Sequence, residues 1–186
     1  NVCDKDGVTR LCDVNFTAYS GEILGVAGIS GSGQKELLEA IAGLQSCKDC
    51  SSIEFISDKG EKKQLSGMHP LDIKNLGVAL AFVPEDRLGM GLVGSMNLTD
   101  NMMLRSYKDG AGPFVDRKTP QKLAETVVRE LEVVTPSINT PVRRLSGGNV
   151  QKVLVGREIA MQPQLLMSAY AVRGLDINTS YNIYHL

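Results

Sequence analysis

Residues 28–37 read GISGSGQKEL, and the fold prediction starts from this glycine-rich stretch. The preceding residues 22–27, EILGVA, form a short apolar run that ends at glycines, which predicts a buried strand. The following residues 35–44 repeat apolar side chains at helical spacing. A strand, a glycine loop and a helix in this order are typical of a phosphate-binding loop.

The glycine loop, residues 28–33, matches such a loop only up to its lysine. Backbone N–H groups at a helix start bind phosphate oxygens there, and glycines let the chain approach closely. Gln34 occupies the position of the phosphate-binding lysine, and Lys35 that of the magnesium-binding Ser/Thr. The loop alone therefore leaves phosphate binding and a ligand-free turn open. The candidate phosphate-contacting residues are Gly28, Ser30, Gly31, Ser32, Gly33, Gln34, Lys35 and Glu36.

The composition is that of one ordinary globular domain. The chain has 186 residues, 42% of them hydrophobic, and a formal net charge of −1. This charge balance argues against a broad face for nucleic acid or membrane. No apolar run approaches the roughly 20 residues of a membrane span, and no signal peptide is visible. Because the chain opens on Asn1 instead of Met, we expect a fragment of a longer protein.

The four cysteines raise the question of a metal site. Cys47 and Cys50 have half of a zinc-ribbon spacing, but no second C-x-x-C follows and the chain has only two histidines. Zinc therefore stays open, but incidental thiols are favoured, and we predict no metal site.

The rest of the chain predicts an α/β core interrupted by helices. Helix 119–131 is expected to have Thr119 as its cap and Pro120 in its first turn. The core would comprise residues 1–92 and 160–186, and the helical part about 93–159. The expected strands are 52–57, 77–83 and 164–168, the expected helices 97–107, 119–131 and about 149–161, and the expected loop 108–114.

A second glycine-rich stretch, residues 145–152, reads LSGGNVQK and stands directly before the last of these helices. Ser146, Gly147 and Gly148 would present free N–H groups at a helix start. An ordinary capped helix would have the same features. The stretch nevertheless resembles the signature loop of ABC-transporter ATPases.

Other stretches resemble further motifs of that family, in the family's order. FVPEDR, 82–87, resembles the glutamine loop, with Glu85 at or near the glutamine position. PQLLMSAY, 163–170, resembles the Walker B strand, and RGLD, 173–176, resembles the D-loop with Gly174, Leu175 and Asp176. The resemblance implies an α/β P-loop (RecA-like) core with an antiparallel β portion and an inserted α-helical subdomain. It implies one nucleotide-binding domain over 1–186, truncated before the histidine switch.

The exact residues of these motifs resemble a narrower group within the family. GxGQxEL, VPEDR, LSGGN followed by QK, and RGLD together resemble the second, C-terminal domain of tandem ATP-binding proteins of simple-sugar and nucleoside importers. The implied partners are the N-terminal nucleotide-binding half of the same polypeptide, membrane permease subunits and, indirectly, a solute-binding protein. No nucleic acid is implied. The implied location is peripheral, on the cytoplasmic side of the cell membrane.

Two departures predict a degenerate site in this domain. In the family, the Walker B aspartate holds magnesium through water and the next glutamate activates the attacking water; Ala169 and Tyr170 stand at these positions. Neither side chain can act as a carboxylate, because alanine has no ligand atom and a phenol is a poor base at neutral pH. With Gln34, three contributions are missing. Since losing one electrostatic group costs about 100- to 1000-fold, we expect the domain's own site to be nearly inert.

The signature is intact, so the resemblance implies a composite site. ABC domains pair head to tail, so one domain's signature meets ATP held by the other. We expect weak ATP binding by this chain alone, with ATP and Mg²⁺ held at the composite site. The residues contributed in trans would be Leu145, Ser146, Gly147, Gly148 and Asn149.

Several alternatives remain at this point. The domain could be a docking module that contacts membrane subunits without binding nucleotide; a P-loop kinase or GTPase is disfavoured because it needs the lysine missing at 34. Glu85 could point into a cleft or pair with Arg87. Asp176 could cap a helix beginning near Ile177 as well as contact the partner. Lys152 and Arg157 are expected on a solvated helix face.

Overall fold

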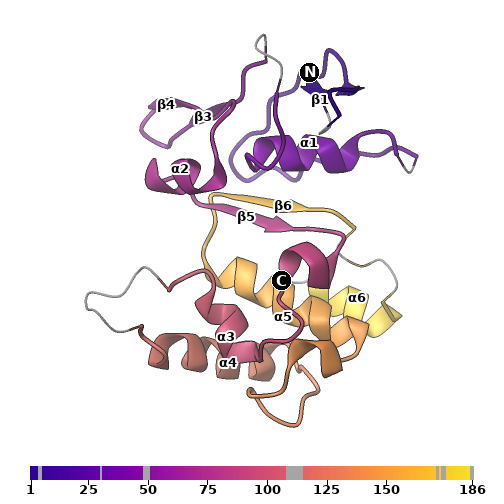
Figure 1. Cartoon of the computed structure of the whole chain (residues 1–186), viewed down its shortest axis with the longest axis vertical. Helices are drawn as coiled ribbons and strands as arrows, with labels where there is room; N and C mark the ends of the chain where they lie inside the picture. Colours follow the sequence, from indigo (N-terminus) through magenta and orange to yellow (C-terminus); the bar gives the residue numbers. More distant parts are fainter. Residues whose placement is uncertain are drawn as a thin grey trace. The chain divides into compact units, whose positions relative to one another are not determined.

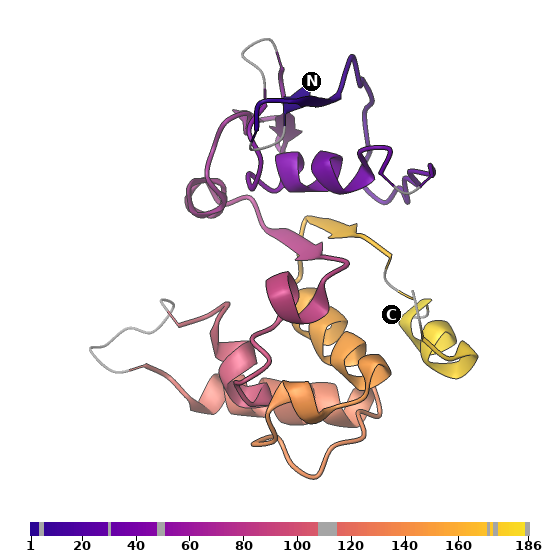
Figure 2. The ribbon, with the colours of Figure 1, turned by 45° about the vertical axis from the view of Figure 1, so that its right-hand side comes forward.

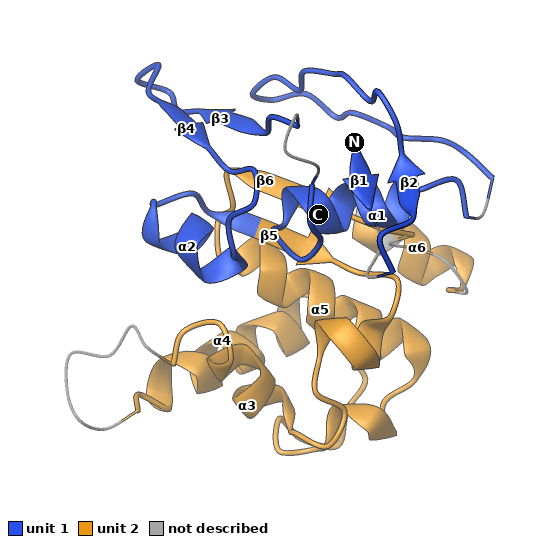
Figure 3. Cartoon of the chain, turned by 45° about the horizontal axis from the view of Figure 1, so that its top comes forward, with its two compact units in different colours: residues 1–80 blue, residues 81–186 orange. Residues whose placement is uncertain are grey.

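The computed structural model has mixed helices and strands in two compact units, residues 1–80 and residues 81–186 (Figures 1 and 3). It describes residues 1–3, 6–29, 31–47, 51–107, 115–170, 172 and 175–184. The expected loop at 108–114 lies outside the described residues, as do Ser30, Cys50, Arg173 and Gly174.

In unit 1, helix α1 (Gln34–Ile41) packs against β1 (Val2–Cys3) and β2 (Thr9–Leu11), which pair antiparallel (Figure 2). Strands β3 (Glu54–Ile56) and β4 (Lys62–Gln64) form a second antiparallel pair, followed by α2 (Pro70–Asn75). These pairs confirm the expected antiparallel β portion. A small core gathers apolar side chains from β3 to the start of β5, with Leu65, Ile73 and Val78 at its centre.

The prediction of a buried strand at 22–27 is wrong. No strand is formed there, and residues 21–29 are all exposed, with Ile23 99% accessible. A strand needs a neighbour to take up its backbone hydrogen bonds. Among the described residues of unit 1, the strand pairs are β1–β2 and β3–β4, and neither includes this segment. The apolar composition of residues 22–27 therefore predicted a strand for which unit 1 supplies no partner.

Unit 2 packs its helices on one side of a two-stranded sheet, β5 (Leu80–Val83) and β6 (Leu165–Ser168) (Figures 1 and 2). The predicted strands here are confirmed, although β6 buries only Met167. The core centres on α5, whose Val153 and Leu154 are fully buried. Between the strands lie a π-helical turn η1 (Arg87–Gly91), α3 (Leu98–Met103), α4 (Lys118–Glu130), a 3-10 turn η2 (Val142–Arg144) and α5 (Gly147–Ala160), and α6 (Ile177–Tyr184) follows β6.

The cap predicted for α4 is wrong, because the N-cap is Arg117, two residues before Thr119, and it makes no side-chain hydrogen bond to the helix. Thr119 lies inside the helix, and the Asp116 carboxylate accepts hydrogen bonds from the N–H of Lys118 at 2.8 Å and from the Thr119 hydroxyl. The hydroxyl and these N–H groups hold the pKa of Asp116 below its usual value. An aspartate two residues before the helix thus accepts from the first backbone N–H groups of α4.

No helix in the described ranges is both long enough and apolar enough to cross a bilayer.

Candidate functional site

The glycine loop has the backbone that its glycines predict. Gly31 and Gly33 have φ of 85° and 95°, and Gly33 caps α1 in a left-handed conformation without a side-chain hydrogen bond. A Cβ on Gly33 would lie 2.4 Å from Leu11 Cδ2, so a side chain is excluded there by conformation and by space. No described residue accepts a hydrogen bond from the N–H groups of residues 34–36. The first turn of α1 can therefore receive an anion.

The side chains after this loop do not restore what the missing lysine would supply. A Cβ on Gly28 would lie 2.4 Å from Gln34 Nε2, so the amide of Gln34 lies against the start of the loop. The Lys35 ammonium lies 3.7 Å from Glu39 Oε1, one turn along α1. The loop offers a neutral amide where a phosphate-binding lysine is expected, and no hydroxyl or carboxylate in the magnesium position. These residues fit a phosphate but not Mg²⁺.

The end of β6 carries no acid in the two positions where carboxylates are expected. Ala169 donates its backbone N–H to Val83 O at 2.8 Å, which ties the two strands together. Tyr170 follows in a left-handed conformation, φ 54°, with its ring half exposed. Glu85 is exposed just beyond β5, and Arg87 donates to Gly147 O at 3.4 Å, which links the VPEDR segment to the signature. The glycine loop belongs to unit 1 and these residues to unit 2.

The signature turn, residues 145–149, lies at the start of α5 and is partly exposed. Ser146 is the N-cap, and its Oγ accepts from Asn149 N–H at 3.4 Å and from Asn149 Nδ2 at 2.9 Å. Ser146 and Gly147 are exposed, and no described residue accepts from the N–H groups of Gly147 and Gly148. The turn therefore presents two N–H donors and a hydroxyl at the positive end of a helix, which is an anion-binding arrangement.

Asp176, in the segment expected to be the D-loop, lies next to the signature turn. A Cβ on Gly148 would lie 3.4 Å from Thr179 Cγ2 and 3.8 Å from Asp176 Oδ2. Asp176 caps α6, as expected, by accepting from Thr179 N–H at 2.9 Å. Hydrogen bonds from the backbone and side chain of Thr179 hold the pKa of Asp176 below its usual value. Asp176 is thus ionised at neutral pH.

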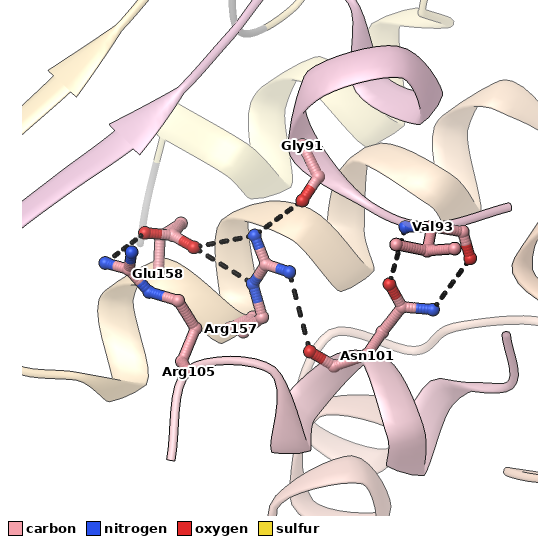
Figure 4. Close-up of polar contacts among 6 residues, drawn as sticks. All are labelled: Gly91, Val93, Asn101, Arg105, Arg157 and Glu158. Carbon is pink, nitrogen blue, oxygen red and sulfur yellow. Dashed lines mark hydrogen bonds and ion pairs between the residues drawn. The ribbon is translucent and has the colours of Figure 1, made fainter. Parts of the chain in front are cut away.

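A buried ion-pair network joins the residues after β5 to the signature helix (Figure 4). Arg157 lies 2.8 Å from Glu158 Oε1 and donates to the carbonyl oxygens of Gly91 at 2.7 Å and Asn101 at 3.5 Å. The other oxygen of Glu158 lies 3.1 Å from Arg105. Burial lowers the pKa of the Arg157 guanidinium, and the facing carboxylate of Glu158 opposes this. The network connects α3, α5 and η1 through charge-assisted contacts.

The prediction that Lys152 and Arg157 lie on a solvated face is wrong. Arg157 is 5% exposed, and the nearly buried Lys152 donates from Nζ to Glu132 O at 3.3 Å, at the end of α4. Sequence reasoning missed this network because α5 is buried on nearly all sides, so its charges cannot mark a solvent face. The adjacent charges of Arg157 and Glu158 were the available signal, since buried charges are paired.

Solved structures share this fold. The chain matches a dimeric ATP-binding cassette solved with ADP and phosphate, at a TM-score of 0.76 and 21% identity over 95% of this chain and 72% of that one. A second cassette matches at a TM-score of 0.70 and 16% identity, over 99% of this chain and 72% of that one. The class is therefore a P-loop ATP-binding cassette fold of the α/β type, as predicted.

The family follows from the sequence comparisons. The family model described as ABC transporter matches residues 11–168, and the chain belongs to this family. The guanosine import ATP-binding protein NupO of Bacillus subtilis is 36% identical over 95% of this chain and 34% of its own length. The xylose import ATP-binding protein XylG of Moorella thermoacetica is 36% identical over 94% of this chain and 33% of its own length. The chain thus spans about a third of the relatives it matches.

Proposed function

We propose that the chain is an ATP-binding half of an importer for simple sugars or nucleosides, and that it lends its signature turn to ATP held by a second cassette. The names of the relatives support the importer class, since they import guanosine, xylose and galactose or methyl galactoside. Each relative is long enough to contain a second cassette beside the matched part. In this proposal the second cassette is the N-terminal half of the same polypeptide.

The observation that carries the proposal is the exposed, capped start of α5. The N–H groups of Gly147 and Gly148 have no acceptor among the described residues, and Ser146, whose hydroxyl caps the helix, is exposed. Donors held in place at a helix start stabilise phosphate charge without reorganisation. A facing cassette that holds ATP would supply the phosphate oxygens.

In the proposal, the glycine loop of this chain forms a nucleotide site that is nearly inactive. Gln34, Ala169 and Tyr170 stand where a lysine and two carboxylates would act: Gln34 carries no charge, Ala169 has no ligand atom, and a phenol is a poor base at neutral pH. The chain's own site is therefore nearly inert, and ATP with Mg²⁺ is turned over at the composite site. In the proposal, Leu175 and Asp176 would meet the partner cassette, and Asp176 lies near Gly148.

The remaining partners follow from the importer class. Membrane permease subunits would receive the cassette pair, and a solute-binding protein would act through them. The cassette would lie at the cytoplasmic side of the membrane as a peripheral subunit.

Turnover of the assembled cassette pair tests the proposal. Ser146→Arg fills the anion-binding turn with a long side chain, and Gly147→Asp places a carboxylate at the exposed helix start, where it would repel phosphate. Each should lower ATPase turnover by about 100- to 1000-fold, the cost of losing an oxyanion-type donor. Ser137→Arg, in the exposed turn after α4, is the matched control and should keep the rate. An unchanged rate in both signature variants would end the proposal.

Nucleotide titration tests the degenerate loop separately. When a fluorescent ATP analogue is titrated into this chain alone, binding should not saturate at micromolar analogue, since the loop lacks a lysine at position 34. Gln34→Lys should tighten binding by restoring a charge that pairs with phosphate. Micromolar affinity of the unmodified chain would contradict the degenerate loop.

A docking module that binds no nucleotide remains the second candidate. Its support is a set of exposed apolar side chains after VPEDR: Leu88, Met90, Val93 and Met96. In this candidate function these side chains would contact the membrane subunits. If ATP and Mg²⁺ produce no thermal shift in the cassette pair, the docking module is the better interpretation.

A further inference from the structure

The side chain of Asn149 bridges the signature serine and the segment that follows α4. Its Nδ2 lies 2.9 Å from Ser146 Oγ, and its Oδ1 accepts from the backbone N–H of Val134 at 2.9 Å. Asn149 occupies the third position of α5, and its own backbone N–H also donates to Ser146 Oγ, at 3.4 Å. One residue therefore makes two hydrogen bonds to the serine and one to a different part of the chain.

The contact with Val134 determines which way the Asn149 amide points. A backbone N–H can only donate, so the atom of the amide that faces Val134 must be the oxygen. The NH₂ group then faces Ser146, where it can only donate. The usual ambiguity between amide oxygen and nitrogen is thus resolved by the hydrogen bonds themselves.

This orientation determines what the Ser146 hydroxyl can do. A serine oxygen has two acceptor lone pairs and one O–H donor. Both lone pairs are engaged by N–H groups of Asn149. The hydroxyl proton is left to donate outward, and its fitting partner is an acceptor with no proton of its own, such as a phosphate oxygen.

We infer that Asn149 is a positioning residue, which commits the Ser146 hydroxyl to donate to the phosphate of ATP bound by the facing cassette. The inference rests on the proposed function and adds to it the residue that polarises the serine. In this inference Asn149 acts on the nucleotide through Ser146, because its amide donates one N–H to Ser146 and accepts from Val134.

Three substitutions at position 149 separate this role from others. Asn149→Asp keeps the shape and the bond from Val134, but it turns a donor into an acceptor, so the serine proton is drawn inward. Asn149→Leu removes the donor without adding charge. Asn149→Gln keeps the amide N–H donor and the amide oxygen acceptor. In the assembled cassette pair, the Gln variant should keep turnover within about twofold, Leu should lose several-fold, and Asp should lose at least about tenfold.

The melting temperature of the Asp variant should not fall together with its turnover. An aspartate in the first turn of a helix interacts favourably with the helix dipole, so Asn149→Asp should keep the melting temperature or raise it while turnover falls. The loss should lie mainly in kcat and little in KM, since the facing loop holds most of the nucleotide. Asn139→Asp, an exposed residue in the turn after α4, adds the same charge and should leave turnover unchanged.

The outcomes distinguish this inference from the proposed function. If Asp and Leu at 149 both keep turnover within about twofold of the unmodified protein while Ser146→Arg abolishes it, the inference fails and the proposed function stands. If Leu keeps full turnover and only Asp reduces it, charge repulsion explains the result and the inference also fails. If Ser146→Arg itself has no effect, the proposed function fails first.

Discussion

Two glycine-rich turns begin helices in this molecule, and they are built differently. The glycine loop at α1 depends on backbone conformation: Gly31 and Gly33 have positive φ, and Gly33 caps the helix without a side chain. The signature turn at α5 depends on side chains: Ser146 caps the helix, and Asn149 ties the serine to Val134.

The two helices also differ in how deeply they are buried. Along α5, nine residues are buried, and an ion-pair network fastens its far end, whereas α1 buries only Ala40. The segment before α1 is exposed, and the signature turn is followed directly by the core of unit 2. The donor set that the proposed function assigns to a partner's ligand is thus held by its own side chains and core, whereas the glycine loop depends on its glycine backbone.

The largest expected effect tests the anchoring of α5. Glu158→Leu leaves the Arg157 guanidinium buried beside Arg105 with no carboxylate, and breaking a buried pair in this way costs about 3–5 kcal/mol of unfolding free energy. The measurement is urea unfolding, with amide hydrogen exchange of α5 to locate the change.

The same helix bundle offers a matched control for this pair. Arg129 and Glu130 on α4 lie 3.4 Å apart, but their side chains are 73% and 62% exposed, against 6% and 1% for Arg157 and Glu158. Glu130→Leu should therefore change stability by about 1 kcal/mol or less. Equal costs at positions 130 and 158 would show that burial does not anchor the signature helix.

A smaller effect is expected from substituting glycine in the two turns. Gly33→Ala forces a Cβ into a left-handed conformation and against Leu11, and should destabilise α1 by about 1–3 kcal/mol. Gly148→Ala has no positive φ and meets Thr179 at 3.4 Å, so about 0.5 kcal/mol or less is expected. Hydrogen exchange resolves α1 and α5 separately. A cost at Gly148 as large as that at Gly33 would contradict the backbone-built loop.

The smallest effect concerns pH at the helix start beside the signature turn. Hydrogen bonds from Thr179 lower the pKa of Asp176, so its ionised form favours the folded state. That contribution is present above the pKa of the unfolded chain and is lost as pH falls through the lower folded-state pKa. Asp176→Asn should therefore flatten the acid side of the stability profile of α6, measured by exchange. An identical profile in this variant would show that Asp176 does not stabilise α6.

Much of the fold was predictable because its signals are local. The helices at 34–41, 98–103 and 147–160 follow from signals that lie within or next to each helix, namely the spacing of apolar residues and the residues at the helix start. Asp176 was predicted to cap α6, and it does so. The motif order led to the family, which the family model confirms.

Two of the errors share one physical cause. Residues 22–27 look like a buried strand, but a strand depends on a hydrogen-bonding neighbour that may be far away in sequence. Arg157 looks like a surface residue, but its burial depends on Gly91 and Asn101, more than fifty positions away. Thr119 is a different case, because Asp116, which accepts from the start of α4, lies only three positions before it.

The sequence by itself determined which chemical groups exist: a glycine loop without its lysine, a strand end without its acids, and an intact LSGGN turn. Only the tertiary structure decided how those groups are held, because hydrogen-bond direction depends on partners brought together by folding. Val134 orients the amide of Asn149, and that amide leaves the Ser146 hydroxyl as an outward donor.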